Sequence, residues 1–135
     1  MDLKKEFGTD KEKEIDGKWF PISDSAKLLI ARIGNPNYAK VFRRLTRPYK
    51  RAIRTDRLPE EKSDEILIQT MAETILLGWE GLEEDGVPVT YSTTEAVRML
   101  TEYKDFRDMV SEIASEMEAF KVEDDEEAEG NSEAS

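Results

Sequence analysis

Residues 36–54 separate apolar from cationic side chains so cleanly that this stretch is constrained to a helix. At about 100° per residue, one arc holds the apolar residues Tyr38, Val41, Phe42, Leu45, Tyr49, Ala52 and Ile53. The opposite arc holds the cations Lys40, Arg43, Arg44, Arg47, Lys50, Arg51 and Arg54. This pattern is typical of an amphipathic helix with one buried and one solvated face. Asn35 and Pro36 suit its start, and Pro48 is expected to kink or split it because proline lacks a backbone donor.

The segment before this helix predicts a β-hairpin. The runs IDGKWFPI and AKLLIARI are rich in β-prone residues and are joined by a polar Ser23–Ser25 turn. Pro21 demotes the first strand to an edge of the sheet. Leu28 and Ile30 alternate with their neighbours, so one face of the second strand is expected to be buried.

Helical periodicity returns after Leu58. A helix from Pro59 to Gly78 or Gly81 is expected to bury the stripe Ile68, Met71, Ala72, Ile75, Leu76 and Trp79. Ser92 and Glu95 match a capping box at the start of the next helix. Asp105 is expected to cap a last helix whose apolar face holds Phe106, Met109, Val110, Ile113, Met117 and Phe120.

These patterns predict a mainly α fold: a small helical domain of four to five helices, with a short N-terminal β-hairpin and a disordered acidic C-terminal tail. The expected organisation is a disordered N-terminal segment at 1–14, a helical domain at 15–121 and a disordered tail at 122–135. The two end segments are polar and charged, and such compositions cannot build a core.

Composition argues against an enzyme and against cofactor or metal binding. The 135 residues include no Cys and no His, which removes thiolate metal sites and any Ser-His-Asp triad. The chain has no phosphate-binding GxxxxGK[ST] or GxGxxG loop. The acidic run Glu83-Glu84-Asp85 lacks the spacing of a calcium loop and is interpreted as a polar turn.

The charge is unevenly distributed. The net charge is −11, yet residues 27–57 hold ten Lys or Arg and one acid. The cations Lys40, Arg43, Arg44, Arg47, Arg51 and Arg54 are candidate partner-binding residues. They could contact nucleic acid, dock onto an acidic neighbouring subunit, or form a solvated face. Nucleic acid is disfavoured by the overall acidity, and because the aromatic side chains lie on the opposite arc.

A second candidate surface is a helix-binding groove formed by Trp79, Met109, Val110 and Met117. Methionine suits adaptable binding surfaces, whereas a tryptophan at the end of an apolar stripe is more often a core residue. Membrane association is not expected, because the longest apolar run, at 75–77, is too short to cross a bilayer. No signal peptide is recognised at the N-terminus, so cytoplasmic localisation is expected.

Several short motifs occur in an order that resembles the tail assembly chaperones of long-tailed (siphovirus-type) bacteriophages. The segment KLLIARI leads into Asn35-Pro36-Asn37-Tyr38 and a basic helix. Next come LGWEGL at 77–82 and DGVPVTYS at 85–92. Glu95-Ala96, Met99-Leu100 and YKDF at 103–106 follow, before an acidic tail. The resemblance covers about residues 15–135.

That resemblance implies a partner and a place of action. Such chaperones bind the tape measure protein, keep it soluble in the host cytoplasm and are absent from the mature virion. They tend to self-associate. A longer form, made by ribosomal frameshifting, is thought to recruit tail tube (major tail) subunits, and Glu129-Gly130-Asn131 permits the slippery run GGGAAAC. The alternatives are a small helical nucleic-acid-binding regulator or adaptor using residues 40–54, and a structural virion subunit.

Overall fold

The computed structural model describes residues 1–122, and the predicted acidic tail lies almost entirely outside them. The first elements are α1 (Leu3–Phe7), α2 (Lys11–Asp16), β1 (Lys18–Pro21) and β2 (Lys27–Ile30). Next come α3 (Pro36–Thr46), the 3-10 turn η1 (Arg47–Tyr49), α4 (Lys50–Arg54) and α5 (Glu60–Thr74). The chain continues through β3 (Leu76–Glu80), β4 (Glu83–Glu84), β5 (Val87–Pro88), α6 (Thr93–Glu102), α7 (Lys104–Ser115) and η2 (Glu118–Phe120).

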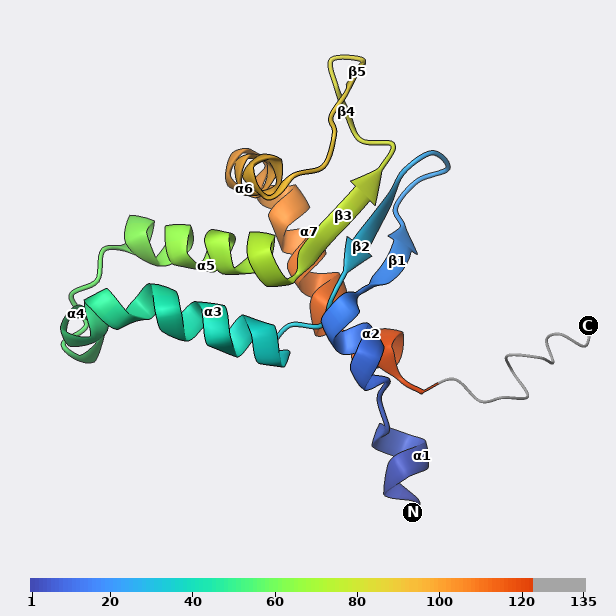
Figure 1. Cartoon of the computed structure of the whole chain (residues 1–135), viewed down its shortest axis with the longest axis horizontal. Helices are drawn as coiled ribbons and strands as arrows, with labels where there is room; N and C mark the ends of the chain where they lie inside the picture. The colour runs from blue at the N-terminus through green and yellow to red at the C-terminus, as the bar shows by residue number, and fades with distance from the viewer. Residues whose placement is uncertain (123–135) are drawn as a thin grey trace, which may run out of the picture.

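A three-stranded antiparallel sheet, in the order β1-β2-β3, lies next to α7 and above α2 in the view of Figure 1. The predicted hairpin is confirmed by the pairing of β1 with β2, and β1 is the edge strand that Pro21 favoured. Leu28 and Ile30 are fully buried, as their alternation predicted. The core around them draws residues from α5, β3, α6 and α7.

The predicted mainly α fold is wrong, because the domain is mixed α/β with a three-stranded and a two-stranded sheet. The long helix expected to reach Gly78 or Gly81 stops at Thr74, and the next residues form β3. Leu28 pairs with Trp79 across the ladder. A hairpin of β1 and β2 alone would leave the inner edge of β2 without backbone partners, and β3 supplies them. The periodicity of the buried stripe therefore could not distinguish one long helix from a helix that ends at Thr74 and is followed by a strand.

Helices α3 and α5 lie side by side and project from the sheet as an arm, residues 36–74, with α4 at its far end (Figure 1). Pro48 splits the predicted basic helix, since α3 ends at Thr46 and α4 begins at Lys50. Val41 is the buried residue of α3. A single neighbouring helix covers α3, and this leaves much of the arm's surface open.

Asn35 fixes the root of the arm. Its Oδ1 accepts a hydrogen bond from the backbone N–H of Tyr38 at 3.0 Å, the predicted N-cap. Its Nδ2 donates to the carbonyls of Arg32 at 2.7 Å and Thr74 at 3.3 Å. Because Asn35 is only 5% exposed, these bonds join the start of α3 to the end of α5 in a water-poor site.

The expectation of disorder at 1–14 is also wrong in the structure, where α1 and α2 occupy most of that segment. Asp2 and Asp10 cap the two helices through their side chains. The backbone N–H of Asp10 donates to the carbonyl of Phe120 at 2.8 Å, and Arg32 Nη1 lies 2.6 Å from Glu14 Oε2. Although burial acts to raise it, hydrogen bonds from Thr9 and Arg32 hold the pKa of Glu14 below its ordinary value. Caps and these long-range contacts replace the apolar core that this segment lacks.

The start of α6 agrees with the sequence pattern, whereas α7 begins earlier and ends before Met117 and Phe120, which were expected on its apolar face. Ser92 Oγ accepts from the Glu95 N–H at 3.0 Å, which confirms the cap of α6. Helix α7 begins at Lys104, with Tyr103 rather than the expected Asp105 at the cap position. It ends at Ser115, and Phe120 lies beyond it, fully buried, with its ring 6.0 Å from that of Phe20.

Gly81 connects β3 to β4 at a point where the backbone has no room for a side chain. Its φ is +84°, and a Cβ there would lie 1.9 Å from the Ser25 carbonyl oxygen. We expect Gly81→Ala to lower the free energy of unfolding by about 2–3 kcal/mol, through backbone strain and this clash. Urea unfolding of the wild type and the variant measures this loss of free energy.

Gly86 provides the matched control. Its φ is +80°, but an added Cβ would meet nothing within 4 Å. Gly86→Ala should therefore cost only the strain of positive φ, about 1 kcal/mol. Equal losses in the two variants would show that the contact with Ser25 has no energetic weight.

Candidate functional site

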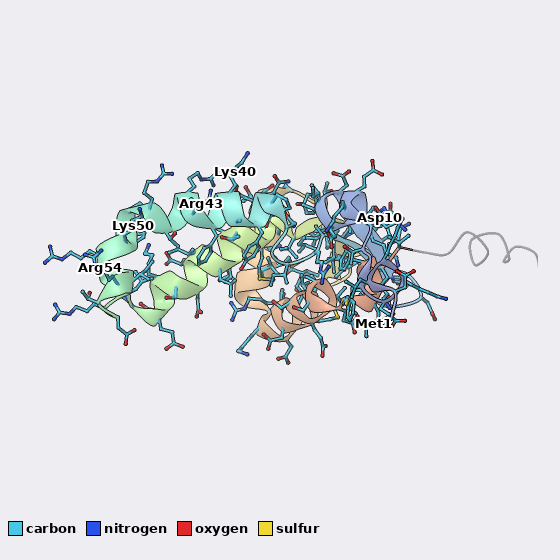
Figure 2. The ribbon with its side chains drawn as sticks, turned by 90° about the horizontal axis from the view of Figure 1, so that it is seen from below. Met1, Asp10, Lys40, Arg43, Lys50 and Arg54 are labelled. Atoms are coloured by element: carbon cyan, nitrogen blue, oxygen red, sulfur yellow. The ribbon has the colours of Figure 1, made fainter. Side chains whose placement is uncertain are left out.

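Six cations on the arm form a row that we call the basic row: Lys40, Arg43, Arg47, Lys50, Arg51 and Arg54. All six are exposed, and none forms an ion pair within residues 1–122. Figure 2 shows Lys40, Arg43 and Lys50 pointing away from the arm along one edge, with Arg54 at the far end. The row therefore presents unneutralised charge to solvent.

Arg44, the remaining cation of the predicted partner-binding set, is used differently. Its Nη2 lies 3.0 Å from Glu73 Oε2 and 3.1 Å from Glu73 Oε1, so it joins α3 to α5. The side chain is 56% exposed, and a pair this accessible stabilises the fold only slightly. The structure thus separates Arg44 from the six cations of the basic row.

An open apolar groove of about 300 Å³ lies at the end of the arm, where residues of α3, α4 and α5 meet. Phe42 and Ile53 are 41% and 44% exposed, although the sequence placed both on the buried arc. The groove is lined by Phe42, Thr46, Ile53, Asp56, Leu58, Ser63 and Ile66. The sequence pattern does not reveal this groove, because periodicity identifies an apolar arc without showing how much of that arc a neighbouring helix covers.

The other predicted groove is divided between core and surface. Trp79 and Val110 are 6% and 0% exposed and belong to the core. Trp79 Nε1 donates to the Val89 carbonyl at 2.7 Å, and its ring meets Tyr91 edge-on at a centroid distance of 4.9 Å. Met109 and Met117 are half-buried. The core interpretation of Trp79 is therefore confirmed, and these four residues do not line one open groove.

A larger open cleft, of about 530 Å³, lies between β4 and the junction of α6 with α7. Its apolar part is formed by Leu82, Met99 and Phe106. Its polar part holds four carboxylates and a phenol: Glu83, Glu84, Asp85, Asp105 and Tyr103. We call this surface the acidic cleft. The acidic turn predicted from the sequence forms one of its walls.

Glu84 is the best-fixed carboxylate of the acidic cleft. Arg98 donates to it bidentately, with Nη2–Oε1 at 2.8 Å and Nη1–Oε2 at 3.1 Å. The Tyr103 hydroxyl donates to Glu84 Oε2 as well. The Arg98 hydrogen bonds, followed by that from Tyr103, lower the pKa of Glu84 to about 2. Glu84 thereby ties the β4–β5 hairpin to α6, whereas Glu83, Asp85 and Asp105 form no ion pair within residues 1–122.

This pKa gives a prediction for acid. An unfolded glutamate titrates near pH 4.3, so the ionised folded form contributes stability above that pH. The contribution is lost as the pH falls toward the folded pKa of about 2. We expect the stability advantage of the wild type over Glu84→Gln to shrink between about pH 5 and pH 2. Urea unfolding at several pH values measures it, and a pH-independent difference would contradict the assignment.

Comparison with known proteins places the chain in a phage family. A sequence model of the YdaY prophage protein family matches residues 33–131. That range contains the whole arm, β3, the acidic cleft, α6 and α7. The chain belongs to the YdaY prophage protein family. This family membership makes it a phage-derived protein, while no curated protein and no solved structure matches it.

Two further findings concern residues 1–122. No helix there is long and apolar enough to cross a membrane. No three His, Cys, Asp or Glu side chains in this part of the chain are grouped so that they could hold a metal ion.

Proposed function

We propose that this YdaY-family protein is a bacteriophage tail assembly chaperone that binds the tape measure protein and keeps it soluble during tail assembly. Its family membership supports a phage-related role. The ordered motifs that resemble tail assembly chaperones support the specific one. The observation that carries the proposal is the arm, where residues 40–54 line part of an open apolar groove and carry six exposed cations that form no ion pair within residues 1–122.

The arm has the two properties that a holding chaperone requires. Exposed Phe42 and Ile53 offer apolar contact to an amphipathic helix of a client. The basic row in the same segment, 40–54, attracts acidic side chains and accelerates the encounter. The net charge of −11 keeps a complex soluble. In this proposal the tape measure protein docks a helix in the arm groove, with acidic residues toward Lys40, Arg43 and Arg47.

The remaining parts of the proposal follow from the resemblance. The protein acts in the host cytoplasm, is released before the virion is complete and performs no enzymatic step. A longer frameshifted form recruits tail tube subunits. The codons for Glu129–Asn131, where the shift is placed, lie outside the described residues.

The test is co-expression with the tape measure protein encoded beside this gene. We expect the tape measure protein to become soluble and to co-purify with this chain at low salt, with recovery falling as salt rises. Phe42→Ser with Ile53→Ser should abolish recovery, and Trp19→Ser is a matched control on the sheet, where Trp19 is 39% exposed. An insoluble tape measure protein beside a free, folded chain would contradict the proposal.

The basic row also favours a second candidate, a nucleic-acid-binding regulator or adaptor. Cations along one edge of the arm can follow a phosphate backbone. In that case, affinity for labelled duplex DNA or RNA should fall steeply and linearly on a log–log plot against salt. It should be unaffected by replacing Phe42 and Ile53. Client recovery that depends on these two residues favours the chaperone.

A further inference from the structure

The acidic cleft has the features of a docking site for a basic amphipathic helix. Leu82 and Phe106 are half-buried and form its apolar floor together with Met99. Glu83, Asp85 and Asp105 rim the floor and lack ion-pair partners within residues 1–122. A ligand that covers this apolar floor also shields the three carboxylates from water, which is costly unless they gain cationic partners. Such a ligand must therefore carry both apolar and cationic side chains.

The arm of this same chain carries that combination. The basic row supplies cations that form no ion pair within residues 1–122, and Phe42 and Ile53 supply exposed apolar surface in the same segment, 40–54. On one copy the two surfaces are far apart, because α4 ends the arm while β4 stands beside α6 on another side of the molecule (Figure 1). An arm can therefore reach a cleft only on another copy.

We propose that the acidic cleft receives the basic arm of a second copy of this chain. The contact joins two different surfaces, so a bound pair still offers one free arm and one free cleft. Such a head-to-tail contact extends into a chain or closes into a ring. If the arm is also the client site, which rests on the proposed function, then self-association and capture of the tape measure protein exclude each other.

The test uses two full-length variants whose defects are complementary. The arm variant, Arg43→Glu with Arg51→Glu, reverses two charges of the basic row. The cleft variant, Glu83→Lys with Asp105→Lys, reverses two charges at the rim of the acidic cleft. These positions are exposed, and Glu84 with its Arg98 contacts is left intact. Sedimentation velocity at low salt measures the size. We expect concentration-dependent oligomers for the wild type and at least about tenfold weaker association for each variant alone.

A 1:1 mixture of the two variants gives the decisive result. The intact cleft of the arm variant can bind the intact arm of the cleft variant, so the mixture should form heterodimers and stop there. Monomers in the mixture, or unchanged oligomers in either variant, would overturn the proposal. Lys4→Glu with Lys5→Glu, and Glu6→Lys with Glu116→Lys, are charge-matched controls at exposed positions and should associate like the wild type. Circular dichroism melts confirm that every variant is folded.

Adding the tape measure protein separates this proposal from the proposed function. The cleft variant should remain monomeric and still solubilise the tape measure protein, whereas the arm variant should also remain monomeric but fail to solubilise it. If the wild type assembles head-to-tail but binds no tape measure protein, the chaperone function is refuted and the arm-to-cleft contact between copies still stands. Wild-type oligomers that persist intact with bound client would refute the competition for the arm.

Discussion

Trp79→Ala is expected to lower the free energy of unfolding by about 3–5 kcal/mol, the usual cost of removing a buried tryptophan. Trp79 is 6% exposed, packs on Tyr91 and donates to the Val89 carbonyl. It also lies on β3, opposite Leu28, so the cavity would open between the sheet and the helices of the core. Urea unfolding followed by circular dichroism measures the change.

Trp19 provides the internal control, because the chain has only two tryptophans. Trp19 is 39% exposed, and its main polar contact is Lys27 Nζ at 4.7 Å from the ring centroid. Trp19→Ala should cost about 1 kcal/mol, in keeping with an exposed cation–π contact. Trp79→Phe should cost about 1–2 kcal/mol for the lost hydrogen bond. Equal costs for the two alanine variants would contradict the placement of Trp79 in the core.

The second large effect is on client binding. Replacing Lys40, Arg43 and Arg47 together with glutamine should weaken binding of the tape measure protein about tenfold, mainly through a slower association rate. The reason is that these cations have no ion-pair partner within residues 1–122, so their charge is free to act on a client. Surface plasmon resonance with immobilised tape measure protein, at two salt concentrations, measures both rates.

Arg44→Gln is the matched control for these three changes. Arg44 lies on the same helix, but its guanidinium is already engaged by Glu73. We expect its loss to change client affinity by less than about threefold and to cost at most about 1 kcal/mol of stability. If Arg44→Gln weakened binding as much as the triple variant, the basic row would not be a distinct site.

The sequence predicted local structure well wherever a short-range cause was sufficient. Asn35 caps α3, Ser92 caps α6 and Pro48 divides the basic helix, because each effect depends on a few neighbouring backbone groups. The alternation of Leu28 and Ile30 correctly identified the buried face of β2.

Long-range causes explain what the sequence did not show. The end of α5 at Thr74 depends on the free edge of β2, about forty-five residues earlier in the chain, and Leu76 and Trp79 are apolar in either structure. Phe42 and Ile53 are exposed because the arm has too few neighbours to cover them. The acidic cleft needs residues from β4, α6 and α7, whose proximity only the tertiary fold reveals.

The most direct test of the chaperone proposal is to follow this protein through tail assembly. After induction of the prophage, quantitative mass spectrometry would compare assembly intermediates that contain the tape measure protein with purified particles. We predict that the protein is abundant in the intermediates and absent from the particles. Its presence in particles at the copy number of a structural subunit, or its absence from the tape measure intermediates, would contradict the account.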